Sequence, residues 1–191
     1  MKKYLLPLLL GLTTTAYAEV KISYNPEIPQ QDKPGLEQRI KAIAGKFMKQ
    51  PYADLGPCDF LGKYDVNVCV IPFKEQLIKN GAKYFPNENT IIIINVPFPL
   101  FERGLIHEFS HAYDWNKDKT ICEKKPTKKE YFFLEEIKDK MPKPIYNALI
   151  NVKSKYIKEK ENLDNWDDIY ASRWPIILNW YYEELKKKNK K

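Results

Sequence analysis

The sequence predicts an α+β protein, in which a small N-terminal sheet precedes a helical C-terminal half. Three observations support this prediction. Segments rich in β-branched residues lie in the first half of the chain, whereas from Phe101 onward the apolar residues recur with helical spacing almost to the end. The chain has 191 residues, with no internal repeat and no interdomain linker, which suits one domain with a sizeable core.

The first 18 residues have the organisation of a secretory signal peptide. Met1-Lys2-Lys3 is basic, residues 4–12 are apolar, and Ala16-Tyr17-Ala18 matches the small-residue pattern of a cleavage site. We therefore expect export to the periplasm or the medium, removal of residues 1–18, and one domain over residues 19–191. No later stretch approaches the roughly 18 apolar residues of a membrane span, so we expect no transmembrane segment.

The formal net charge is +7, from 32 Lys and Arg against 25 Asp and Glu. The lysine runs at 124–129 and 186–191 are typical of solvated faces or tails. An exported chain without a known nucleic-acid-binding motif is not expected to bind nucleic acid. The expected partner is instead a peptide or protein substrate, and no pattern indicates an oligomeric state.

After the leader, the chain is expected to begin irregularly and then to form a helix. Residues 19–33 contain Pro26 and Pro29 and are typical of extended, irregular chain. Pro34 then begins a helix, because proline suits the first helical turn. The apolar residues that follow recur on one face of that helix. These residues are Leu36, Ile40, Ile43 and Phe47.

Two strands and a short helix are expected next. Residues 64–71 (YDVNVCVI) alternate in polarity, so their valines line one side of a half-buried strand. Residues 90–96 (TIIIINV) are too β-branched and too short for a helix, and they predict a strand buried on both faces. Between these strands, a helix is expected from about Phe73 to Asn80-Gly81, a typical C-terminal stop.

The second half is expected to be helical, with breaks at residues 119–126, 141–144 and 162–165.

Export would place the three cysteines in an oxidising compartment. A bridge from Cys58 to Cys69 would close a local turn and stabilise the fold by about 2–3 kcal/mol in the chain-entropy model. A bridge from Cys69 to Cys122 is equally compatible with the sequence, and either pairing leaves one thiol over.

The only two histidines in the chain predict a metal site. Residues 104–114 read GLIHEFSHAYD, so His107 and His111 lie four residues apart with Glu108 between them. On a helix, positions i and i+4 share a face, so both imidazoles can reach one ion. Zinc binds imidazole nitrogens at about 2.0–2.1 Å and suits a site with one open position. Glu108, at the same edge, can accept the proton of a water activated by the metal.

With this motif and the strand before it, the chain resembles the zincin metallopeptidases over residues 90–115. That superfamily places an HExxH helix beneath a small sheet with an edge strand, and a helical subdomain then supplies a third ligand. The resemblance implies a minimal zincin-like domain that hydrolyses peptide bonds with Zn2+. It also implies that His107 and His111 are zinc ligands and that Glu108 is the general base.

The third ligand is expected further along the chain, as in the Glu-zincins. Asp168 lies in a segment, DDIYAS, that resembles the E-aromatic-aromatic-Ala ligand helix of lethal-factor-type bacterial zincins, with Asp in place of the usual Glu. We therefore predict Asp168 as the ligand. Glu135 is an alternative, because with Asp139 it matches the E-x-x-x-D pattern of thermolysin-like enzymes. Glu136 is another, because it matches the ligand helix of certain mitochondrial processing peptidases.

The residues after the second histidine exclude one branch of the zincins and add Asp114 as a candidate site residue. Metzincins carry Gly three and His six residues after the second histidine, where this chain has Asp114 and Lys117, so that branch is excluded. Asp114 shares a face with His111. It is expected either to accept the outer N–H of a ligand histidine or to be a surface charge at the end of the helix. Zincins often carry a transition-state tyrosine or histidine. Because this chain has no third histidine, a tyrosine would have to serve, and the 13 tyrosines offer no basis for choosing one.

The sequence therefore predicts an exported zinc metallopeptidase that uses a metal-activated water, with Glu108 as general base. One alternative is a non-catalytic secreted binding protein, in which the histidines hold a structural metal. The other is a zinc amidase that acts on an envelope polymer.

Overall fold

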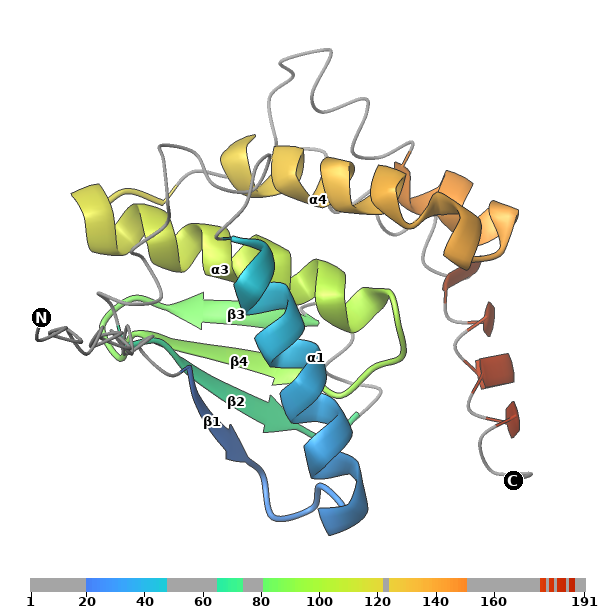
Figure 1. Cartoon of the computed structure of the whole chain (residues 1–191), viewed down its shortest axis with the longest axis horizontal. Coiled ribbons are helices and arrows are strands. Elements are labelled where there is room, and N and C mark those ends of the chain that lie inside the picture. The colour runs from blue at the N-terminus through green and yellow to red at the C-terminus, as the bar shows by residue number, and fades with distance from the viewer. Residues whose placement is uncertain are drawn as a thin grey trace, which may run out of the picture.

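The computed structural model describes residues 20–47, 65–73, 81–121 and 124–150, together with 176, 177, 179, 180, 182–184, 186 and 187. Within these residues, a four-stranded sheet has helices packed on one face (Figure 1), which confirms the α+β class. Among the helices of this part of the chain, none combines the length and the apolar character that crossing a membrane requires.

The sheet has the strand order β1-β2-β4-β3. The strands are β1 (Lys21–Tyr24), β2 (Asn67–Ile71), β3 (Ala82–Phe85) and β4 (Thr90–Ile94). The pairs β1·β2 and β2·β4 are parallel, whereas β3 runs antiparallel to β4. Strand β3 therefore forms one edge of the sheet, with a tight turn joining it to β4.

Two of these strands were not predicted from the sequence. The segment expected to be irregular contains β1, which is only four residues long and exposes alternate side chains. Its Ile22 is in register with the buried Val68 of β2. Strand β3 follows Gly81 and is equally short. Such short segments acquire their strand character from the neighbour with which they pair, so local propensity is a weak guide.

The two predicted strands are present, with narrower bounds than expected. In β2, Val68 and Val70 are fully buried, as the alternation predicts. In β4, Ile91 and Ile93 are buried on the face that carries the helices. On the other face of β4, Ile94 is buried but Ile92 is only half-buried, so that face is less completely covered.

Cys69 lies in the middle of β2, in register with Ser23 of β1 and Ile92 of β4. Its thiol is free in the structure, so neither predicted bridge through Cys69 is formed. Its side chain lies on the face of β2 opposite the buried Val68 and Val70, where it is half-buried. Cys58 and Cys122 lie outside the described residues.

The first helix, α1 (Lys33–Lys46), begins with proline in its first turn and buries the predicted apolar face. The long helix α3 (Leu100–Asp118) follows β4, and α4 (Lys124–Glu136) packs against α3. The predicted break between them is shorter than expected. Helix α4 begins at Lys124 and takes Pro126 into its first turn, where the missing N–H costs no hydrogen bond.

The chain after α4 is interrupted, as predicted, near Met141. A short 3-10 helix, η3 (Lys138–Lys140), precedes the interruption, and residues 143–150 are helical again. The predicted helix between Phe73 and Gly81 and the predicted break at 162–165 lie outside the described residues.

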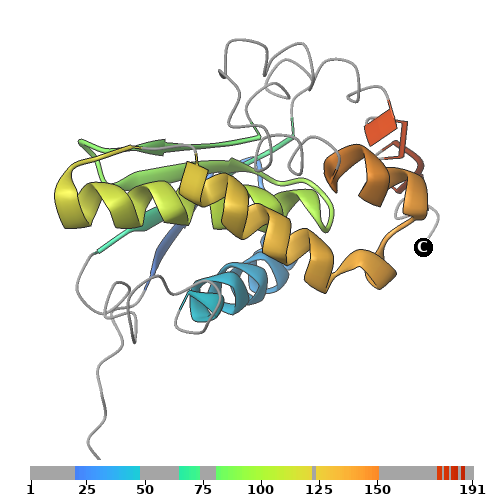
Figure 2. The same cartoon turned by 90° about the horizontal axis from the view of Figure 1, so that it is seen from above.

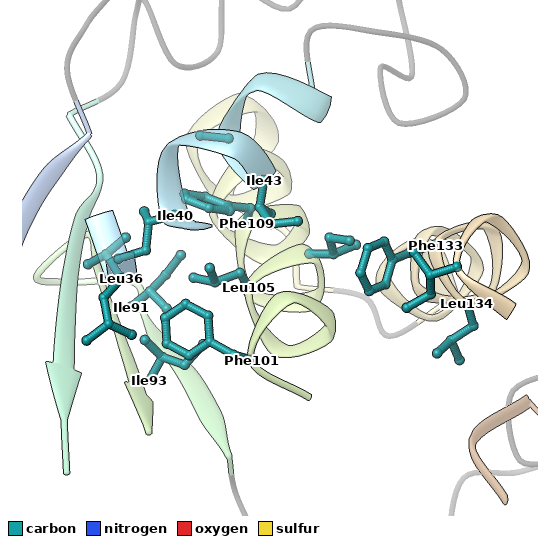
Figure 3. Packing of buried hydrophobic residues seen from close by; sticks show 14 of the residues in the cluster. Leu36, Ile40, Ile43, Ile91, Ile93, Phe101, Leu105, Phe109, Phe133 and Leu134 are labelled. Atoms are coloured by element: carbon teal, nitrogen blue, oxygen red, sulfur yellow. The ribbon is translucent and has the colours of Figure 1, made fainter. Parts of the chain in front are cut away.

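Helix α3 is the centre of the packing. Seen from above, it lies along the sheet, and α1 and α4 lie on the same side of the sheet (Figure 2). Figure 3 shows side chains of α1, β4 and α3 gathered into one cluster, with those of α4 on the other side of α3. The labelled members are Leu36, Ile40, Ile43, Ile91, Ile93, Phe101, Leu105, Phe109, Phe133 and Leu134.

Candidate metal centre

The two histidines and the glutamate between them lie in the middle of α3. Leu105, Phe109 and Ala112 are fully buried and anchor one face of the helix in the core. Gly104 allows α3 to approach the sheet edge closely, because a Cβ at this position would lie 3.2 Å from the Cβ of Ala82 in β3. The site is therefore built on a rigid helix that is held tightly against the edge strand.

The rings of His107 and His111 point at each other, as their helical spacing predicts. Their Nε2 atoms are 2.9 Å apart, and the ring planes are inclined by 72°. Two nitrogens that share one tetrahedral zinc ion lie about 3.3 Å apart, given zinc–nitrogen distances of about 2.0–2.1 Å. The observed separation is within about half an ångström of that value, so the histidine pair fits two positions of a zinc site.

Glu108 lies between α3 and the sheet edge, where it is only 8% exposed. Its Oε2 atom accepts the backbone N–H of Tyr84 at 2.7 Å. Ile94 donates its N–H to the carbonyl of Gly81, so the backbone of Gly81 faces β4. Because successive residues of a strand direct their backbone groups to alternate sides, the N–H of Tyr84, three residues later, points away from β4. The carboxylate thus contacts the outward-facing backbone of an edge strand, a group that a docking peptide strand would also meet.

Glu130 of α4 contacts His107, and sequence reasoning did not identify it as a site residue. Its Oε1 atom is 2.5 Å from Nδ1 of His107, and its Oε2 atom accepts a hydrogen bond from Arg103 at 2.9 Å. The carboxylate is completely buried. One signal in the sequence could have revealed it, because Glu130 begins the apolar i, i+3, i+4 stripe that continues with Phe133 and Leu134. An acid on such a stripe needs a partner in the interior.

Two of the three predicted candidates for the third ligand, Glu135 and Glu136, lie within the described residues. Asp168 is outside the described residues. Glu135 accepts a hydrogen bond from the hydroxyl of Tyr146 at 2.6 Å, and Glu136 forms an ion pair with Lys46. Within the part of the chain that the structure describes, no group of three or more His, Cys, Asp or Glu side chains could hold a metal ion. Within the described residues, the structure does not bring Glu135 or Glu136 together with the two histidines.

Asp114 is not the surface charge that one of its two predicted roles required. Asp114 is only 1% exposed. It also does not lie at the end of the helix, because α3 continues to Asp118. That role is wrong, and acceptance of a histidine N–H stays a prediction.

A second polar cluster fixes the turn between β3 and β4 to α3. The hydroxyl of Tyr84 donates to Oδ1 of Asn89 at 2.8 Å, and Asn116 of α3 donates to the same oxygen at 2.9 Å. Burial raises the pKa of Tyr84 to about 12, so its hydroxyl stays protonated near neutral pH. Asn89 has a positive φ of 45°, which asparagine tolerates in such turns. This cluster holds the edge strand in place beside Glu108.

No family model, curated protein or solved structure matches this chain.

Proposed function

We propose that the protein is an exported zinc-dependent metallopeptidase with a zincin-like domain. The observation that carries this proposal is the convergence of the two histidine Nε2 atoms, 2.9 Å apart, on the helix that also carries Glu108. Two further features support it. The outer nitrogen of His107 contacts a buried carboxylate, as metal-ligating histidines commonly do, and the sheet ends in an antiparallel edge strand beside Glu108.

In this proposal, His107 and His111 hold zinc through their Nε2 atoms. Asp168 is the predicted third protein ligand. Zinc, when bound, would polarise the scissile carbonyl and lower the pKa of a water molecule beside it.

Glu108 is the proposed general base. It accepts the proton of the attacking water and passes it to the amine that leaves the cleaved peptide bond. The Tyr84 N–H donates a hydrogen bond to one oxygen of this carboxylate. The contact fixes the orientation of the carboxylate at the sheet edge.

The substrate is proposed to be an extended peptide that lies along β3. An edge strand offers outward backbone N–H and C=O groups, with which a peptide can pair as an additional strand. Because the N–H of Tyr84 is within hydrogen-bonding distance of Glu108, a peptide bond at this register would pass close to the proposed base.

The test combines metal content with peptide cleavage, in the protein of residues 19–191. We expect about one zinc ion per chain by elemental analysis, together with cleavage in a mixed peptide pool. Glu108→Gln should keep the zinc and lose cleavage by at least about 100-fold, because the proton acceptor is removed. Glu102→Gln is the matched control, since it changes another buried glutamate of α3 that pairs with Arg39.

Four results would separate the alternatives or exclude the proposed base. Failure to bind zinc, even after reconstitution, would exclude the metal site and the peptidase with it. Zinc binding without cleavage of any peptide would favour the non-catalytic binding protein, and cleavage restricted to an envelope polymer would favour the amidase. Equal cleavage by Glu108→Gln and wild type would exclude the proposed base.

A further inference from the structure

We propose that Glu130, anchored by Arg103, is a positioning residue that fixes the ring of His107 with its Nε2 atom toward the metal. This inference rests on the proposed function, because it concerns how the chain prepares one of the two histidines for zinc. It assigns roles to two residues that the sequence motif does not contain.

The geometry of the three side chains supports this role. Arg103 and His107 lie four residues apart on α3, so their side chains share one face of the helix. The carboxylate of Glu130 reaches across from α4 and bridges them, with Oε2 on Arg103 at 2.9 Å and Oε1 on Nδ1 of His107 at 2.5 Å. With Nδ1 occupied in this way, the Nε2 atom of His107 is the one that faces His111.

The burial of Glu130 makes this arrangement stiff. The carboxylate is completely buried, and the Arg103 side chain is only 18% exposed. A buried carboxylate needs charged or hydrogen-bonding partners, so it cannot easily turn away from Arg103 and His107. The adjacent α4 residues Phe133 and Leu134 are buried in the core and hold this part of the helix in place.

The same contact determines which ring nitrogen of a neutral His107 carries the proton. A carboxylate accepts hydrogen bonds when ionised, so a neutral imidazole beside it carries its proton on Nδ1 and has its lone pair on Nε2. That tautomer can bind zinc through Nε2. Outer-sphere partners of this kind typically raise metal affinity by about 10–100-fold.

The structure offers a matched control residue, Glu102, on the helix that carries Arg103 and His107. Glu102, the residue before Arg103, is also buried and forms an ion pair with Arg39 of α1 through two hydrogen bonds. It resembles Glu130 in burial and in having an arginine partner, and both of these hydrogen bonds come from Arg39. A change at Glu102 therefore reports the general cost of neutralising a buried glutamate.

The experiment measures zinc affinity by competition with a chromogenic chelator, for wild type, Glu130→Gln, Arg103→Lys and Glu102→Gln. We expect Glu130→Gln to raise the zinc Kd by about 10–100-fold, and Arg103→Lys to raise it by at least about 3-fold. Arg103→Lys keeps the positive charge beside Glu130, so it tests the anchor in a chain that retains its buried ion pair. Glu102→Gln should stay within about 2-fold of wild type.

A second measurement does not depend on zinc. Nitrogen-15 NMR of the metal-free wild-type protein should show His107 with its proton on Nδ1 when the ring is neutral. A predominant Nε2–H form would overturn the proposal.

Three affinity results would overturn it as well. They are an unchanged Kd in Glu130→Gln, an equal loss in Glu130→Gln and Glu102→Gln, and a loss beyond about 10,000-fold in Glu130→Gln, which would identify Glu130 as a direct ligand. These failures differ from failure of the proposed function, because in each of them wild type still binds zinc.

Discussion

Replacement of Gly104 by alanine tests the close contact between α3 and the sheet edge. The new Cβ would lie 3.2 Å from the Cβ of Ala82 and 3.6 Å from Cδ1 of Ile93. The first distance is a few tenths of an ångström too short, and Ala82 belongs to a strand whose backbone must move to relieve it. Alanine gains about 1 kcal/mol over glycine in a helix interior, whereas overpacking costs about 1–3 kcal/mol. We therefore expect a net loss of about 0–2 kcal/mol in the free energy of unfolding.

Gly45 of α1 provides the control, because nothing lies within 4 Å of a Cβ added there. Gly45→Ala should raise the free energy of unfolding by about 0.5–1 kcal/mol. The assay is urea denaturation of the metal-free protein, followed by circular dichroism. The double variant Gly104→Ala/Ala82→Gly should recover about 1 kcal/mol relative to the sum of the single changes, because it removes the other atom of the contact. If Gly104→Ala stabilised the protein as much as Gly45→Ala, or if the two changes were additive, the close contact would be refuted.

Three further predictions concern a core phenylalanine, one tyrosine and the metal. Phe109→Ala should lower the free energy of unfolding by about 3–5 kcal/mol in urea denaturation, because this ring is fully buried and packs against the ring of Phe47. Burial and the hydrogen bond to Glu135 raise the pKa of Tyr146 to about 12, so its contribution to stability is complete below pH 10 and is lost as the pH rises from 10 to 12. The wild-type free energy of unfolding should fall more steeply across that range than the value for Tyr146→Phe. Removal of zinc by a chelator should lower the Tm in wild type, and a Tm that does not respond to zinc in either direction would argue against the site.

The elements predicted correctly are those whose signals are local. Pro34 and the apolar spacing after it specified α1, and the run of isoleucines specified β4. Strand β3 escaped prediction, because four residues without a strong β-branched run acquire their structure from pairing with β4. The same limit applied to Asp114, whose burial depends on the elements packed around α3 and not on its neighbours in the chain.

The residues of the candidate site also fall into those predicted from local spacing and those brought together by packing. The i, i+4 spacing of His107 and His111 was enough to predict that they share one helical face, because this spacing has one geometric consequence on a helix. The contact of Glu130 with His107 and that of Glu108 with the backbone of Tyr84 depend on tertiary packing and could not be read from the chain. Those contacts join α3 to α4 and to β3, and their partners are separated by 23 and 24 residues along the chain. Helical periodicity relates residues only within a few turns, so contacts of this range arise from how the elements pack.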